Sequence, residues 1–163
     1  MRHLCVCLFL LGLPTAPLLA QLDPYQEATR AFNDGQPERG LQLLDQVLAQ
    51  QPTHTDARYA RAYYYYEAGD YEASLRDCDR LLRQQPRDTA AYLLRGQTLV
   101  ALDELDAAED DFRAALALDS TDFNTHNQLG HLLFERDDLP GATAEFAASI
   151  RRQDNAFARE YRA

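Results

Sequence analysis

Residues 89–122 read TAAYLLRGQTLVALDELDAAEDDFRAALALDSTD, and residues 123–156 repeat the arrangement as FNTHNQLGHLLFERDDLPGATAEFAASIRRQDNA. A shift of 34 residues aligns identical residue types at several positions: Gly96 with Gly130, Ala108 with Ala142, and Phe112 with Phe146. A fixed internal period of this length is typical of proteins built from stacked structural repeats. The period therefore decides the fold class before any single helix is assigned.

The same period extends toward the N-terminus and divides the chain into four copies without insertions: 21–54, 55–88, 89–122 and 123–156. One aliphatic column runs through all four copies: Leu48, Leu82, Leu116 and Ile150. A tail of residues 157–163 follows the last copy.

Each copy contains two helical patterns separated by a break. In the second copy the helices are expected over about Asp56 to Ala68 and Tyr71 to Gln84, because Gly69-Asp70 combines a helix-ending Gly with a capping Asp. Pro86 stops the second helix. Equivalent breaks lie at Gly35-Gln36, Asp103-Glu104 and Asp137-Asp138. The pattern predicts eight repeat helices and a short ninth helix in the tail.

Small residues recur where the two helices of a copy must approach closely. They are Ala28, Ala62, Gly96 and Gly130 in the first helices, and Gly40, Ser74, Ala108 and Ala142 in the second. A bulky slot should fill the space beside them: Leu44, Cys78, Phe112 and Phe146. A large residue at Gly130 is expected to cost ~1–3 kcal/mol by overpacking.

These slots resemble the tetratricopeptide repeat family, whose pattern is W-x2-L-G-x2-Y, then A-x3-F, then P, with a period of 34. The third copy fills them with Tyr92, Arg95, Gly96, Leu99, Ala108, Phe112 and Ser120, although the Trp slot is never Trp and the first copy matches least well. The resemblance implies an all-α, right-handed α-solenoid over 21–163, with four tandem helix-turn-helix repeats. A short C-terminal helix over 157–163 would cap it, with Phe157 and Tyr161 covering the last face.

In this family the first helices of successive repeats line a concave groove that holds a peptide or an extended protein segment. The corresponding candidate binding positions are Tyr25, Thr29, Phe32, Tyr59, Tyr63, Tyr66, Leu93, Gln97, Asn127, His131 and Phe134. Some members bind acidic C-terminal tails through a clamp of Lys, Asn and Arg. In this sequence the corresponding positions hold no cation. Over the first three repeats they are Tyr25, Thr29, Ala60, Ala90 and Leu94. Over the last three repeats they are Tyr59, Tyr63, Leu94, Asn124 and Gln128. The groove should instead suit an apolar, neutral or mildly basic segment.

The run Tyr63-Tyr64-Tyr65-Tyr66 points in four directions on a helix. Tyr63 and Tyr66 share a face with Tyr59, while Tyr64 should pack against the preceding repeat and Tyr65 falls on the intra-repeat core slot. Two interpretations remain open for the shared face: ordinary packing, or an aromatic strip in the groove.

Composition excludes several classes of function. The 163 residues carry 26 acids against 16 bases, all of them Arg, for a formal net charge of −10, which lacks the basic footprint of a nucleic-acid binder. The densest acidic run, Asp103 to Asp111, is interpreted as a solvated outer face. Cys78 occupies a bulky slot and is expected to be a buried core thiol.

Residues 1–20, MRHLCVCLFLLGLPTAPLLA, have the layout of a secretory signal peptide cleaved after Ala20. An uncleaved membrane anchor is the alternative, although the apolar run is short beside the ~20 residues of a spanning helix. Cleavage would remove one Arg and no acid, which leaves a charge of −11 and a single Cys. Export is thus expected. The absence of Lys and of N-x-Ser/Thr sequons favours a bacterial periplasm as the destination. Secretion and signal anchoring are the alternatives.

No catalytic, cofactor or metal motif is evident. His131 and Glu135 lie one helical turn apart, but two ligands without a third do not make a zinc site. The sequence predicts a non-enzymatic, exported module that binds a protein or peptide in its groove, as an adaptor or assembly factor. We expect neither a nucleic-acid partner nor a small-molecule substrate. Contact with a membrane is expected only if the signal segment stays attached. The alternative is a structural or oligomerising scaffold that acts through its ends or its acidic convex face.

Overall fold

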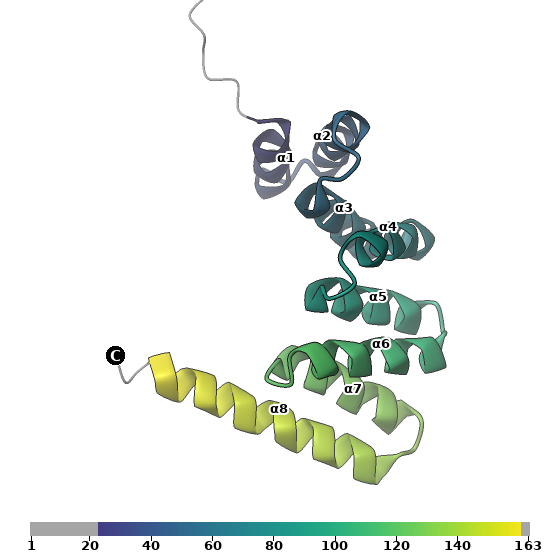
Figure 1. Cartoon of the computed structure of the whole chain (residues 1–163), viewed down its shortest axis with the longest axis vertical. Helices are drawn as coiled ribbons and strands as arrows, with labels where there is room; N and C mark the ends of the chain where they lie inside the picture. The colour runs from purple at the N-terminus through teal and green to yellow at the C-terminus, as the bar shows by residue number, and fades with distance from the viewer. Residues whose placement is uncertain (1–22, 161–163) are drawn as a thin grey trace, which may run out of the picture.

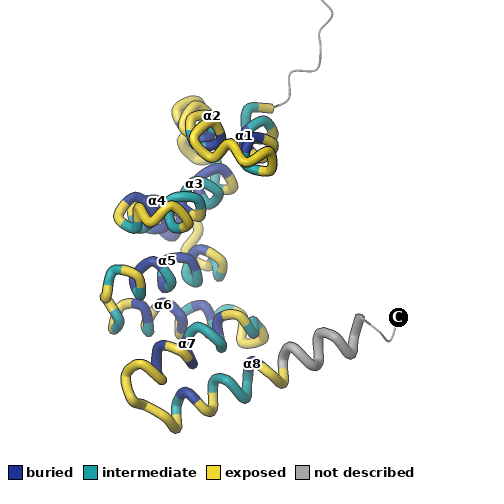
Figure 2. The backbone as a smooth tube through the Cα atoms, turned by 180° about the vertical axis from the view of Figure 1, so that it is seen from behind, coloured by how far each residue is buried: buried dark blue, intermediate teal, exposed yellow. Residues whose placement is uncertain are grey.

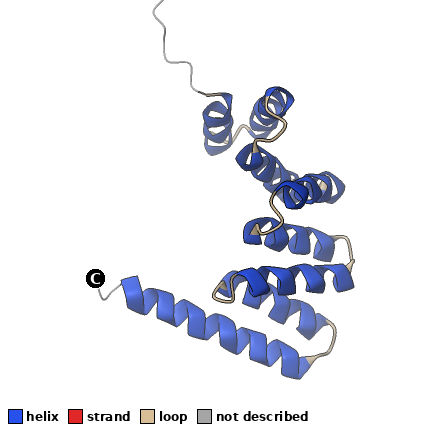
Figure 3. Cartoon of the chain, viewed as in Figure 1, coloured by secondary structure: helices blue, strands red, loops and turns tan. Residues whose placement is uncertain are grey.

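The structure is a computed structural model that describes residues 23–160, with side chains described over 23–151. Eight helices follow one another in this range and no strand occurs in it (Figures 1 and 3). They are α1 (Pro24–Asn33), α2 (Pro37–Gln50), α3 (Thr55–Glu67), α4 (Tyr71–Gln84), α5 (Thr89–Ala101), α6 (Leu105–Leu118), α7 (Phe123–Glu135) and α8 (Leu139–Glu160). The all-α class and the pairing of helices within each repeat are confirmed. The signal-peptide prediction for residues 1–20 lies outside the described residues.

The four predicted breaks fall at the ends of the first helices. The residue after each C-cap has a positive φ: 71° at Gly35, 80° at Gly69, 62° at Asp103 and 64° at Asp137. Glycine enters this left-handed region freely, and Asp is among the few other residues that tolerate it. The Asp70 carboxylate then caps α4 by accepting the Ala73 N–H at 3.1 Å, as predicted. Local sequence therefore sets each turn within a repeat.

Small residues let the two helices of a repeat approach closely, as the sequence predicts. A Cβ atom added to Gly96 would lie 2.5 Å from the ring of Phe112, and one added to Gly130 would lie 2.7 Å from the ring of Phe146. Because real Cβ atoms do not come so close to a ring carbon, each aromatic side chain occupies space that only glycine leaves open.

The repeats hold together by sharing apolar cores across their junctions. Figure 2 marks the buried residues of the stack in dark blue. Phe112 of α6 packs in one cluster with Leu129 and Leu132 of α7, and Leu44 of α2 packs with Ala57 of α3. A single helix pair cannot bury its apolar surface alone, so stability comes from stacking on neighbours.

The odd-numbered helices form the inner side of the stack. Helix α3 contacts α5, and α5 contacts α7, whereas no two even-numbered helices pack together to the same extent in the described part of the chain. Successive repeats are therefore closer on the side of the first helices, which bends the stack around them (Figure 1). This side is the concave face on which the binding positions were predicted.

The expected ninth helix is not a separate element. Helix α8 runs without interruption from Leu139 to Glu160, through most of the segment 157–163 that was predicted to form a cap. The physical reason is local: neither Pro nor Gly lies between Ala142 and Glu160, so nothing turns the backbone at the end of the fourth repeat. The predicted covering role of Phe157 and Tyr161 lies outside the described side chains.

Among the described residues, the helices are all too short or too polar to cross a membrane.

Candidate functional site on the concave face

An open pocket of about 300 Å³ lies on the concave side where the first three repeats meet. Tyr25 of α1 and Tyr59 of α3 line it, and these two residues occupy the same slot of successive repeats. The remaining lining comes from Thr55, Asp56, Ala60, Gln85, Asp88 and Ala90. The pocket thus combines two phenol rings with two carboxylates and contains no basic side chain.

Both phenols are held in the protonated state. Partial burial raises the pKa of Tyr25 and that of Tyr59, and the negative charges of Asp56 near Tyr25 and Asp88 near Tyr59 raise them further. The hydroxyl groups therefore remain hydrogen-bond donors well into the alkaline range.

The tyrosine run divides as its helical spacing predicts, with one exception. Tyr64 stacks on Phe32 of the preceding repeat, with ring centroids 3.3 Å apart and planes 7° apart, which confirms its predicted role. Tyr63 meets Tyr64 edge-on at 5.6 Å and is 42% exposed. Tyr65 is not in the intra-repeat core: it is half-buried at the surface, with the Arg61 guanidinium 6.0 Å from its ring centroid. The interior position beside it is taken by Arg61 and Asp77, whose side chains are 15% and 4% exposed.

None of the eleven predicted binding residues is fully buried, but they do not contribute equally to an open surface. Phe32 is engaged in packing, because its ring fills the space over Gly40 and stacks on Tyr64. His131 is exposed and meets the ring of Phe146 edge-on at 5.0 Å. Thr29 and Phe134 are exposed, Phe134 to 59%, whereas the other predicted residues are half-buried: Tyr25, Tyr59, Tyr66, Leu93, Gln97 and Asn127.

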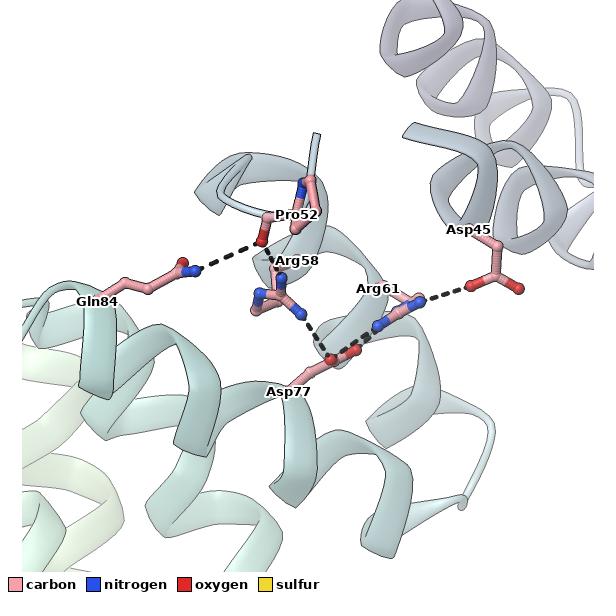
Figure 4. Close-up of polar contacts among 6 residues, drawn as sticks. All are labelled: Asp45, Pro52, Arg58, Arg61, Asp77 and Gln84. Atoms are coloured by element: carbon pink, nitrogen blue, oxygen red, sulfur yellow. Dashed lines mark hydrogen bonds and ion pairs between the residues drawn. The ribbon is translucent and has the colours of Figure 1, made fainter. Parts of the chain in front are cut away.

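Sequence reasoning missed a polar network on the opposite side of α3 (Figure 4). The Arg61 guanidinium donates from Nε and Nη2 to the two carboxylate oxygens of Asp77 at 2.7 and 2.8 Å, and from Nη1 to Asp45 at 2.6 Å. Such two-pronged contacts are the strongest that Arg makes with a carboxylate. Asp45, Arg61 and Asp77 come from α2, α3 and α4, so the network joins two repeats.

The network recurs one period later. Arg95 binds Asp111 through two hydrogen bonds of 2.7 Å and reaches back to Asp79 at 2.8 Å. Each Arg thus lies 16 residues before one Asp and 16 residues after another. This spacing, repeated at +34, is a signal in the sequence that could have identified the network.

The interpretation of the acidic run as a solvated face is therefore wrong for part of it. Asp111 is 5% exposed and paired with Arg95, and Glu109 forms ion pairs with Arg113 and Arg136. The packing of α6 on α5 turns Asp111 toward Arg95, and Glu109 meets Arg113 of its own helix and Arg136 at the end of α7, whereas Asp103 and Asp110 are exposed.

Arg58 adds a second cation to the Asp77 carboxylate from inside the protein. It is 5% exposed, donates to Asp77 at 3.3 Å and to the backbone carbonyl of Pro52, and its Nε atom has no hydrogen-bond partner among the described residues. Asp77 consequently pairs with two Arg side chains, which makes it the central residue of the network.

The fourth repeat uses different residues at the same positions. Leu129 replaces the Arg61 position, and His126 takes the Arg58 position and contacts Glu145, with 2.6 Å between Nδ1 and the carboxylate. Among the described residues, no group of three or more metal-ligating side chains is placed to hold a metal ion.

Cys78 is a core thiol, as predicted. It is fully buried, and burial raises the pKa of its thiol to about 12. At neutral pH the reactive thiolate is therefore absent, and the side chain acts as a small apolar group.

Comparisons with known proteins bear on the fold. Two family profiles, both described as tetratricopeptide repeat, match residues 31–98 and residues 89–122, which together exceed half of the chain. The chain belongs to the tetratricopeptide repeat family. The family consists of non-catalytic scaffold proteins, in agreement with the prediction that the chain is not an enzyme. No curated protein sequence matches the chain.

Several solved structures share the fold of this tetratricopeptide repeat protein. MamA 41-end from Desulfovibrio magneticus RS-1 is 23% identical, with a TM-score of 0.76 over 81% of this chain and 75% of that chain. The thermophilic protein TTC0263 from Thermus thermophilus is 19% identical, with a TM-score of 0.70 over 80% of this chain and 73% of that chain.

The first tetratricopeptide repeat domain of Spaghetti (RPAP3), bound to the HSP90 peptide SRMEEVD, is 20% identical. Its TM-score is 0.67 over 70% of this chain and 90% of that chain. At these identities the likeness establishes the architecture, and the chain is a protein-interaction module by family.

Proposed function

We propose that this tetratricopeptide repeat protein is an exported adaptor or assembly factor that holds an extended segment of another protein against its concave face. The observation that carries the proposal is the open pocket between Tyr25 and Tyr59, on the side formed by the first helices. Tyrosine offers a large contact area with a hydroxyl donor and is enriched in binding surfaces.

Two further observations support it. Tyr63 and Phe134 are large aromatic side chains that stay 42% and 59% exposed although the cores of the same repeats are well packed. The signal-peptide pattern over 1–20 supports export, and the Arg-only base composition supports a bacterial periplasm.

The test is crosslinking in the native cell envelope followed by mass spectrometry. The groove variant is Tyr63→Ala with Phe134→Ala. The matched control is Leu139→Ala with Ile150→Ala, because these residues are equally exposed, at 51% and 58%, and lie on α8 away from the predicted groove positions. We expect the amount of crosslinked partner to fall by about tenfold in the groove variant and to stay unchanged in the control.

A second function is favoured by one observation. Ile150 is 58% exposed, whereas Leu48 and Leu82 in the same column are covered to 7% and 8% exposure by the next repeat. This end face would suit a scaffold subunit that stacks through its last helix. In the same experiment, loss of crosslinks in the Leu139→Ala/Ile150→Ala variant alone would contradict groove binding and support the scaffold.

A further inference from the structure

The pocket on the concave face places acids beside aromatic rings without a basic side chain in its lining. Asp56 and Asp88 line the same pocket as Tyr25 and Tyr59, and no Arg lies among the lining residues. No ion pair within the described residues involves either carboxylate, and Arg58, Arg61 and Arg95 of the central repeats are paired with other acids. The pocket therefore carries an uncompensated negative charge.

We propose that this pocket binds a cationic side chain, Arg or Lys, from the extended segment of the partner. The proposal rests on the proposed function and gives the partner segment its chemistry. Two carboxylates supply the charge complementarity, and the faces of two phenol rings supply cation–π contact, which is strongest where the cation loses part of its water.

Helix geometry does not require the charge at Asp56. The equivalent positions in the next two repeats hold Ala90 and Asn124, and both of those helices form with normal caps. An acid in the first turn of α3 does interact favourably with the helix dipole, but that interaction leaves the carboxylate exposed and facing the pocket.

Asp88 keeps one oxygen for a ligand. Its Oδ1 accepts the Ala91 N–H at 3.1 Å and so caps α5, whereas Oδ2 does not take part in this cap. The ring of His54 lies 5.1 Å from that of Tyr25, and its Nδ1 accepts the Ala57 N–H at 3.2 Å as the N-cap of α3. Arg87 lies beside Asp88 and Gln85 in an adjoining open pocket, and among the described residues neither Arg87 nor His54 forms an ion pair with Asp56 or Asp88.

The size of the pocket favours a side chain over a metal ion. A cavity of about 300 Å³ exceeds what a bare ion fills, and no group of three ligating side chains occurs there among the described residues. A guanidinium or ammonium group with its alkyl stem matches both the volume and the mixed aromatic and acidic lining.

The test is selection of binders from a random twelve-residue peptide display library by the purified chain. The charge variant is Asp56→Asn with Asp88→Asn, because Asn keeps the capping oxygen of residue 88 while removing the charge. The control is Asp103→Asn with Asp110→Asn, which removes the same charge from two exposed acids outside the groove.

We expect the wild-type chain and the control to enrich Arg or Lys at one peptide position, and the charge variant to lose that enrichment. Replacing the enriched residue of a selected peptide with norleucine should weaken binding to the wild-type chain by about tenfold. If peptides are selected without a basic residue, yet fail to bind the Tyr63→Ala/Phe134→Ala variant, the cation pocket is overturned and groove binding stands. If the selected peptides bind both that groove variant and the charge variant as well as they bind the wild type, both proposals fail.

Discussion

Helix α3 has two faces with opposite chemistry, and residues that follow one another in the sequence lie on different faces. Arg58 and Arg61 point into the network with Asp45 and Asp77, where every charge has a partner (Figure 4). Tyr59, between them, turns to the concave side and lines the acidic pocket. Arg58, Arg61 and Arg95 of the central repeats thus join neighbouring helices. The surface available to a partner is left acidic and aromatic.

The network face should be the more fragile one. Asp77→Ala would leave Arg58 and Arg61 without their shared carboxylate, and removing one partner of a buried ion pair costs about 3–5 kcal/mol. We expect the free energy of unfolding to fall by that amount in urea or guanidinium titrations followed by circular dichroism.

Asp110→Ala is the control for this loss, because Asp110 is an exposed acid in the equivalent outer helix of the next repeat. Its stability should stay within about 0.5 kcal/mol of the wild type. Equal losses in the two variants would show that Asp77 is no more important than a surface acid.

The core beneath the groove should respond to alkali. Cys78 packs in one cluster with Ala62 and Leu94, beneath Tyr59, and burial raises the pKa of its thiol from 9.0 to about 12. Above pH 9 the unfolded chain releases this proton while the folded chain holds it, so stability falls as pH rises from about 9 to about 12.

At pH 10.5 this difference alone amounts to about 2 kcal/mol relative to pH 8. The measurement is denaturant unfolding at both pH values for the wild type and for Cys78→Val, which has no proton to lose. The variant should lose about 2 kcal/mol less than the wild type, and parallel losses would contradict the buried thiol.

The smallest effect is expected at the exposed end of the network. Asp45 is 56% exposed at its side chain, so the ion pair with Arg61 is largely screened by water. Asp45→Asn should reduce the free energy of unfolding by less than about 1 kcal/mol, and Asp79→Asn, the equivalent change one repeat later, by a similar amount. A loss as large as that of Asp77→Ala would mean that the outer Asp is also essential.

Much of the concave face could be predicted from the sequence, because the position of a residue within the repeat determines which side of its helix the side chain lies on. The period placed Tyr25 and Tyr59 in one column, and the structure brings them into one pocket. The spacing within the tyrosine run also predicted that Tyr64 packs on the preceding repeat. Phe32 was assigned to the groove by the same rule, but its ring is used to fill the space above Gly40.

Local backbone preference and a fixed period of 34 are enough to predict the repeat, the helix pairs, the breaks and the small-residue contacts. Tertiary structure alone decided the pairing of Arg61 with Asp77, the burial of Asp111 and the outward position of Tyr65. A charged side chain is polar in any sequence pattern. Whether it meets water or an opposite charge depends on which helix packs against it.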